Sequence, residues 1–168
     1  MKLDEAKREF IQAWGTLGSQ WGINKAMAQV HALLLISPES LSTDEIMEQL
    51  NISRGNANMN SRALISWGIV RKEHRLGERK EYFAAEKDIW KVTKQVLAER
   101  KKRELQPVIQ VLDQVEHIDG PKNDKDVEAF TSMIAQLKSF TASSNKTLEK
   151  LMQADEHWFW GSFMKMMR

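Results

Sequence analysis

Two helix start signals, eleven residues apart, constrain this chain more than any other feature of its sequence. Ser42 is followed three residues later by Glu45, which is the spacing of a capping box, and Ser53 is a second N-cap residue. The first helix therefore has room for about two turns before the chain must turn. We expect the second helix over residues 54–67, ending at Gly68, because glycine suits the left-handed position after a helix. The segment predicts two short helices joined by a tight turn.

The hydrophobic period changes after this pair of helices. Val70 precedes and Phe83 follows a turn at Gly77. This pattern favours a two-stranded hairpin with its tip at residues 76–79. Helix, tight turn, helix and basic hairpin, in this order, is the layout of a winged helix-turn-helix domain. The fold class that we expect is mainly α, with a small β-hairpin wing and long N- and C-terminal dimerisation helices.

Helices are expected on both sides of this unit. Apolar residues repeat at three- and four-residue steps in residues 3–20, and again beyond the hairpin, where residues 119–126 separate two long helices. Pro107 is expected to kink the first of these two helices. The second carries a heptad trace of apolar positions, which Thr141 and Ser144 weaken in its middle. The expected organisation is an N-terminal helix at 1–22, the winged domain at 23–88 and a helical dimerisation region at 89–168.

The charge is unevenly distributed along the chain. The net charge is +2 overall, but it is −3 over residues 1–52, +3 over 53–86, +5 over 87–103 and −3 over 104–168. A basic middle between acidic ends is the local footprint that binding to a polyanion needs. The absence of cysteine excludes disulfides and thiolate sites and fits a reducing cytoplasm, which is the location that we expect. No apolar run is long enough to span a bilayer, so no membrane role is expected.

The helix over residues 54–67 combines two unlike faces. At 100° per residue, Ala57, Ser61 and Leu64 fall on a side that can be buried. The opposite side suits base edges and phosphates, because arginine bonds guanine, asparagine bonds adenine and glycine lets the duplex approach. Free N–H groups at the helix start add a place for a phosphate. The residues expected to contact DNA here are Ser53, Arg54, Gly55, Asn56, Asn58, Met59 and Arg62.

Three cations near the hairpin tip complete the expected DNA-contacting set, because cations there suit a minor groove or a phosphate. They are Arg75, Arg79 and Lys80. Each group also has a plainer interpretation. The helix could be an ordinary surface helix with solvated asparagines, and the three cations could belong to an exposed charged turn. The capped helix, the tight turn and the basic hairpin together favour the DNA-binding interpretation.

Six tryptophans are many for 168 residues, and aromatic faces can cage a quaternary ammonium ligand. Core packing is the plainer interpretation of any single tryptophan. Four of them form a candidate effector pocket: Trp14, Trp21, Trp67 and Trp90. The four histidines have no metal-ligand spacing, and the sequence has neither a glycine-rich phosphate loop nor a nucleophile paired with a base. We therefore expect no metal, no cofactor, no catalytic residue and no enzymatic activity.

The segments "LSTDEIMEQLNISRGNANMNSRALISWGIVRK" and "GERKEYFAAEKDIW" resemble the winged-helix domain of the MarR superfamily. Within it, "ISRGNANMNSRALISWGIV", "GERKEYF" and "FIQAWGTLGSQWGINKAMAQVHALLL" are similar to the branch typified by the GbsR-type repressors. The resemblance covers about residues 8–92, and the C-terminal helices match in kind more than in motif. It implies a homodimeric transcriptional regulator whose helix from Ser53 enters the major groove and whose wing is residues 75–80. We expect a repressor, although the sequence leaves repression and activation open. The resemblance also implies terminal helices at the dimer interface and a small molecule that modulates DNA binding.

Three functions remain open at this point. The leading one is a ligand-responsive, dimeric regulator that binds a roughly palindromic operator in double-stranded DNA. A DNA-binding protein without an effector, architectural or constitutive, would show no ligand-dependent change in affinity. A winged helix used for protein contact would lack the basic patch and the salt-sensitive DNA binding that we expect here.

Overall fold

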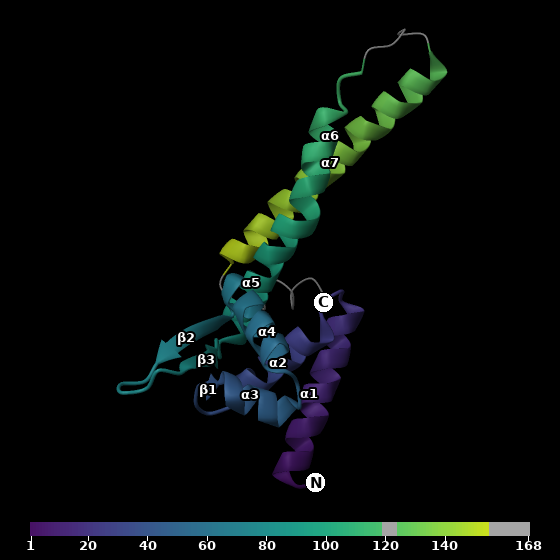
Figure 1. Ribbon diagram of the computed structural model, residues 1–168. Helices are drawn as coiled ribbons and strands as arrows, with labels where there is room; N and C mark the ends of the chain where they lie inside the picture. Colours follow the sequence, from purple (N-terminus) through teal and green to yellow (C-terminus); the bar gives the residue numbers. More distant parts are fainter. Residues whose placement is uncertain (119–123, 155–168) are drawn as a thin grey trace. The chain divides into compact units, whose positions relative to one another are not determined.

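The computed structural model describes residues 1–118 and 124–154 (Figure 1). The chain divides into two compact units, Met1–Gln95 and Val96–Arg168, and each is described by itself. The elements of the first unit are α1 (Leu3–Gln20), α2 (Lys25–Ile36), β1 (Leu41–Ser42), α3 (Thr43–Leu50), α4 (Arg54–Ser66), β2 (Val70–His74) and β3 (Glu81–Ala85). Helix α5 (Ile89–Arg100) begins in this unit and continues into the second.

The two helix start signals fold as the sequence predicts. The hydroxyl of Ser42 accepts a hydrogen bond from the N–H of Glu45 at 3.3 Å, and the N–H of Ser42 donates to the Glu45 carboxylate at 2.7 Å, which completes the capping box of α3. The chain then turns at Asn51, which adopts the left-handed conformation with φ 50°. The hydroxyl of Ser53 accepts from the N–H of Asn56 at 3.2 Å and begins α4. The predicted helix-turn-helix is confirmed.

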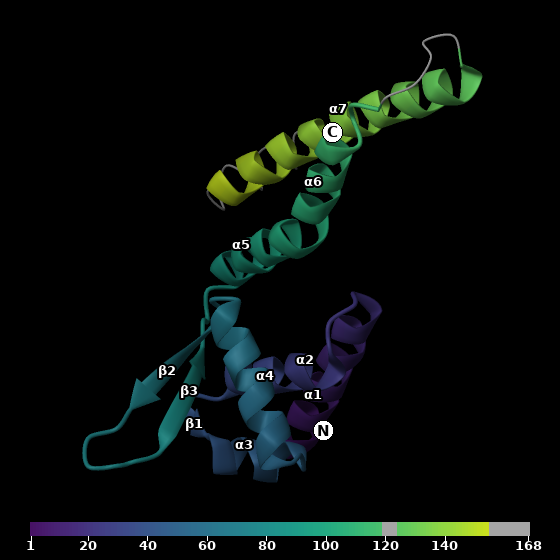
Figure 2. The ribbon, with the colours of Figure 1, turned by 45° about the horizontal axis from the view of Figure 1, so that its top comes forward.

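The sheet has one more strand than the sequence predicts. Strands β2 and β3 form the predicted antiparallel hairpin, with Val70 opposite Ala85, and Figure 2 shows the loop that joins them at the far end of the hairpin. Strand β1 pairs with the other edge of β3, where Leu41 lies opposite Phe83, so the strand order is β1-β3-β2. A strand of two residues is too short to show an alternating pattern. The predicted two-stranded sheet is therefore corrected to three strands.

The core of the first unit lies where the helices α2, α3 and α4 meet the sheet. Each of these elements contributes a side chain that is almost fully buried. They are Val30 and Leu34 of α2, Ile46 of α3, Leu64 of α4 and Phe83 of β3.

Helix α1 packs on α2 through a close approach at Gly18. A Cβ atom added at Gly18 would lie 2.5 Å from the Cβ of Ala28, so a larger residue there would force the two helices apart. From the sequence this glycine only weakens the end of a helix. The structure shows that it allows α1 to contact the winged domain closely.

The second unit consists of long helices interrupted by a π turn. Helix α5 leads into the π turn (Lys101–Leu105), which is followed by α6 (Gln106–Gln114) and α7 (Lys125–Gln153). The predicted kink near Pro107 takes the form of this π turn, and the proline occupies the second position of α6. Proline lacks an N–H, and its ring would collide with the carbonyl four residues back, at Arg103. The widened turn accommodates both effects.

Helix α7 packs on α6 but leaves part of its apolar face exposed. The predicted heptad positions divide between two surfaces, because Ile134 and Thr141 are buried whereas Phe130 and Leu137 are each 41% exposed. Further exposed apolar side chains of this unit are Val108, Val111, Ile118, Met133 and Phe140. Residues 155–168 of the predicted dimerisation region lie outside the described residues. In the described ranges, no helix is both long enough and apolar enough to cross a membrane.

Candidate nucleic-acid interface

Helix α4 buries one face and exposes the other, as its sequence predicts. Ala57 and Ser61 are fully buried and Leu64 is 2% exposed, whereas Met59 is 61% exposed. The buried face packs on α2 and α3, which supports a helix that is weak by propensity. A Cβ atom added at Gly55 would meet no atom within 4 Å. Packing inside the unit therefore does not require a glycine at the start of α4.

Asn60 lies on the buried side of α4, unlike the other asparagines of this helix. It is 3% exposed, and its amide nitrogen donates to the carbonyl oxygen of Asn56 at 2.9 Å and to the side-chain oxygen of the same residue. Asn60 was assigned to neither face of the helix from the sequence. Its position, three residues after Ala57 and four before Leu64, indicates that it lies on the same buried face as these two residues.

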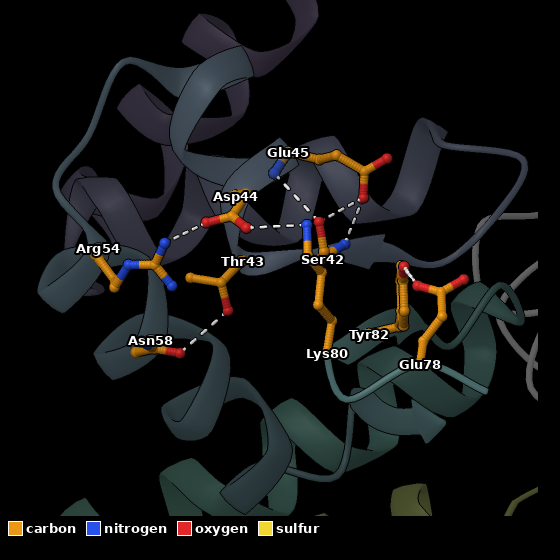
Figure 3. A network of polar contacts seen from close by, with 9 residues as sticks. All are labelled: Ser42, Thr43, Asp44, Glu45, Arg54, Asn58, Glu78, Lys80 and Tyr82. Atoms are coloured by element: carbon orange, nitrogen blue, oxygen red, sulfur yellow. Dashed lines mark hydrogen bonds and ion pairs between the residues drawn. The ribbon is translucent and has the colours of Figure 1, made fainter. Parts of the chain in front are cut away.

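Several polar side chains of the predicted DNA face already have partners within the unit. The Ser53 hydroxyl caps α4, and the side-chain oxygen of Asn58 accepts a hydrogen bond from the hydroxyl of Thr43 at 3.2 Å (Figure 3). The second bond holds the Asn58 amide beside the start of α3. Gly55, Arg62 and the other predicted contacts of α4 remain at least partly exposed.

Asp44, in the first turn of α3, binds two cations from other elements (Figure 3). One carboxylate oxygen accepts a hydrogen bond from the guanidinium of Arg54, the first residue of α4, and the other lies 3.2 Å from Nζ of Lys80 in the hairpin loop. The hydrogen bond from Lys80 is the main cause that lowers the pKa of Asp44, followed by the charge of Arg54. The three side chains are between 43% and 63% exposed, so water screens these pairs.

Glu81, the first residue of β3, makes a similar bridge further along α4. Its carboxylate binds Lys72 of β2 and lies 3.9 Å from the guanidinium of Arg62. The hydrogen bond from Lys72 is the main cause that lowers the pKa of Glu81. Asp44 and Glu81 thus each join one cation of α4 to one cation of the hairpin. The sequence alone does not identify either carboxylate, because their partners are distant in the chain.

Arg75 begins the loop that joins β2 to β3, and its side chain reaches the segment before β1. Its Nη2 donates to the carbonyl oxygen of Ser40 at 2.9 Å, and its guanidinium carbon lies 4.0 Å from the centre of the Tyr82 ring. A carboxylate oxygen of Glu39 lies 3.6 Å from the same nitrogen. These contacts hold Arg75 against the segment between α2 and β1. Its contact with DNA stays a prediction.

Arg79 and Lys80 lie in the loop between β2 and β3, as the sequence predicts (Figure 2). Both are exposed. Lys80 is bound to Asp44, whereas Arg79 makes no ion pair with any residue of the ranges 1–118 and 124–154. Arg79 is therefore the cation of the hairpin loop that can meet a phosphate without first leaving a carboxylate.

The four tryptophans predicted to form an effector pocket differ in their surroundings. The ring of Trp14 lies 6.2 Å from that of His31, between α1 and α2. Exposure ranges from 9% for Trp67 to 59% for Trp21, with Trp14 and Trp90 between these values. Their role in binding an effector stays a prediction.

Two cavities of the described structure bear on the effector hypothesis. One of about 300 Å³ lies in the first unit between the sheet and the segment after α2, and one of about 210 Å³ lies between α6 and α7. Neither is lined by a tryptophan. The first is lined by Lys87, whose ammonium group donates to three backbone carbonyls at 2.7–2.8 Å and so caps the end of α2. These carbonyls belong to Leu34, Leu35 and Ser37.

His31 is a buried titratable group of α2. It is 5% exposed, and Nε2 has no hydrogen-bond partner among the described residues. Burial, and then the charge of Lys87, lowers the pKa of His31 to about 4. No group of three or more histidines, aspartates or glutamates in the described ranges could hold a metal ion.

The structure is similar to a solved structure described as "Crystal Structure of a transcriptional regulator". The TM-score is 0.53 and the sequence identity 18%, over 89% of this chain and 99% of the other. At this identity the similarity shows the fold alone, which is a mainly α winged helix-turn-helix with long C-terminal helices. Neither a family model nor a curated protein sequence matches the chain.

Proposed function

We propose that this protein is a sequence-specific, DNA-binding transcriptional regulator that acts as a homodimer. The observation that carries the proposal is the face of α4 that the unit does not use for packing. Gly55 has open space around it, Met59 is 61% exposed, and the side chain of Arg62 is 71% exposed. Such a face, on the second helix of a helix-turn-helix, suits the reading of bases in a major groove.

In this proposal α4 enters the major groove. Arg62 offers a guanidinium for two hydrogen bonds to guanine, and Asn58, one turn earlier, offers an amide to adenine. The free N–H groups at the start of α4 and the hairpin cations Arg79 and Lys80 hold phosphates on either side. The phosphate contacts position the protein, and the base contacts select the sequence.

The exposed apolar side chains of the second unit support a homodimer. Four of them, spaced three and four residues apart on α7, are between 41% and 69% exposed. They are Phe130, Met133, Leu137 and Phe140. A stripe of this kind is unfavourable in water unless another surface covers it, and a second copy of this chain is the partner that we propose. Two copies of α4 then read half-sites about 10 bp apart.

Two similarities support the same function. The sequence resembles the MarR superfamily and its GbsR-type branch, and the similar solved structure is described as that of a transcriptional regulator. Repression, in preference to activation, follows from the sequence resemblance alone. The cytoplasmic location is an expectation from the missing cysteines and from this function.

We also propose that a small molecule modulates the affinity for DNA, as the resemblance implies. The four tryptophans of the effector hypothesis attract a desolvated quaternary ammonium by about 2 kcal/mol or more per good contact. The ligand can change DNA binding only if its affinity differs between the DNA-competent and incompetent states. Titration with choline, read by tryptophan fluorescence and by operator binding, tests this. No change in either signal at millimolar choline would contradict the cage.

Selection of bound fragments from random double-stranded DNA tests the main proposal. We expect a roughly palindromic sequence that the protein binds about 1,000-fold or more tightly than random DNA at physiological salt. Light scattering at micromolar concentration should give the mass of a dimer. Salt-sensitive binding without sequence preference would instead favour an architectural protein. The absence of salt-sensitive binding would favour a winged helix used for protein contact.

A further inference from the structure

Two carboxylates connect the candidate recognition helix to the hairpin. Asp44 and Glu81 each bind one cation of α4 and one cation from the hairpin (Figure 3 shows the first of these bridges). The partners are Arg54 and Lys80 on Asp44, and Arg62 and Lys72 on Glu81. Three cations of the proposed DNA surface, and Lys72 of β2, therefore face a carboxylate of their own chain.

These bridges contribute little to the stability of the fold. The side chains involved are between 34% and 71% exposed, and water screens such pairs strongly. The buried core of the unit lies on the other face of α4, at Ala57, Ser61 and Leu64. Both carboxyl groups have a lowered pKa, so they remain ionised at neutral pH. Folding alone does not require two acids at this surface.

The positions of the bridges on α4 give them a geometric role. Arg54 and Arg62 are eight residues apart, which is about 12 Å along a helix. Attachment at two separated points restrains both the distance and the rotation of the hairpin relative to α4. Phe83 of β3 is buried and β1 pairs with β3, so the bridges add to an attachment that the hairpin already has.

Their charge gives them a second role at a DNA surface. Binding to non-specific DNA depends on contacts between cations and phosphates. A carboxylate beside each cation competes for it and repels the phosphates. On a matching sequence Arg62 bonds a base in place of a phosphate, so fewer of these cations depend on phosphates there than on any other sequence, and the carboxylates weaken non-matching binding more.

We propose that Asp44 and Glu81 are specificity-determining residues. They lower the affinity for non-matching DNA and restrain the position of the hairpin relative to α4. This inference rests on the proposed DNA-binding function. Neither residue reads a base in this account. They act through the four cations that they hold.

The test compares Asp44→Asn and Glu81→Gln with the matched control Glu48→Gln. Glu48 is an exposed acid of the same helix as Asp44, and it makes no ion pair with any described residue. The control therefore removes the same charge without breaking a bridge. Affinity for the selected operator and for a scrambled duplex is measured across a salt series, and thermal unfolding checks that each variant is folded.

We expect each bridge variant to bind the scrambled duplex about 3- to 10-fold more tightly than wild type, with a salt dependence steeper by about one unit. Operator affinity should change less, so the ratio of the two affinities falls. Asp44→Glu, which keeps the charge, should restore the wild-type ratio. The control should leave the ratio unchanged.

Three results would overturn the inference while leaving the proposed function intact. The first is that Asp44→Asn and Glu81→Gln bind the scrambled duplex as the control does. The second is that Asp44→Glu fails to restore the ratio of operator affinity to scrambled-duplex affinity. The third is that Asp44→Asn loses affinity for the operator alone, which would mean that Asp44 contacts a base. A wild-type protein that shows no salt-sensitive binding to DNA would contradict the proposed function itself.

Discussion

The guanidinium carbon of Arg75 lies 4.0 Å from the centre of the Tyr82 ring, near the loop that joins β2 to β3. The same side chain donates to the carbonyl oxygen of Ser40, so it connects the hairpin to the segment before β1. We expect Arg75→Ala to lower the midpoint of thermal unfolding by about 2–6 °C, because it removes a cation–π contact and a hydrogen bond. Circular dichroism measures this change.

Arg79→Ala is the matched comparison, since Arg79 is exposed and makes no ion pair with a described residue. It should leave the midpoint within about 1 °C of wild type. If Arg79 contacts a phosphate, the substitution weakens binding to all sequences and reduces the salt slope by about one unit. Equal unfolding midpoints for the two variants would contradict a structural role for Arg75.

Arg62→Ala should weaken binding to the selected operator by about 1–3 kcal/mol and relax the preference at one base pair. The reason is the loss of a guanidinium that is 71% exposed on the face of α4. Lys91→Ala is a suitable control, because Lys91 is 62% exposed on α5 and its neighbour is Asp88. Fluorescence anisotropy gives both affinities. An unchanged operator affinity in Arg62→Ala would reject α4 as the recognition helix.

Phe140→Asp should dissociate the proposed dimer. Phe140 is 69% exposed, so the substitution leaves the packing inside the chain intact while placing a charge in the apolar stripe. We expect the dimer dissociation constant to rise by about 100-fold or more, since each copy loses a buried aromatic side chain. Ser139→Asp, at the exposed neighbouring position, adds the same charge beside the stripe. Analytical ultracentrifugation should show a dimer for Ser139→Asp, and a dimer for both variants would place the interface elsewhere.

His31 should make the stability of the protein depend on pH. Its pKa is lowered to about 4 in the folded protein from 6.5 in the unfolded chain, so between these values the unfolded chain binds a proton that the folded protein does not. Stability is therefore lost as the pH falls, and the free energy of unfolding should decrease by about 2 kcal/mol between pH 7 and pH 5 from this residue.

Urea denaturation of wild type and His31→Leu at both pH values isolates this contribution. The variant should lose about 2 kcal/mol less than wild type over the same interval, because leucine does not titrate. It should also remain folded at pH 7, since Nε2 of His31 has no hydrogen-bond partner in the described structure that would be lost. An identical pH dependence in both proteins would show that His31 is not the group responsible.

The helix starts could be predicted because capping acts within three residues, as at Ser42 and Ser53. The two faces of α4 were predictable for the same reason, since a helix relates neighbours by a fixed angle. Strand β1 could not be predicted, because Leu41 and Ser42 become a strand only through pairing with β3. The ion pairs of Asp44 and Glu81 could not be predicted either, because the paired residues come together only in the folded chain.

Helix α4 should exchange its amide protons with solvent faster than α2. Gly55 and the three asparagines of α4 lower its intrinsic stability by about 3 kcal/mol relative to alanine. Most of the free energy that stabilises α4 must therefore come from the packing of its buried face. We expect local opening of α4 to cost less free energy than global unfolding. A duplex lying against the exposed face would suppress this opening. Part of the free energy of DNA binding would then be used to order α4. The decrease in the amide exchange rate of α4 on DNA binding would measure this part.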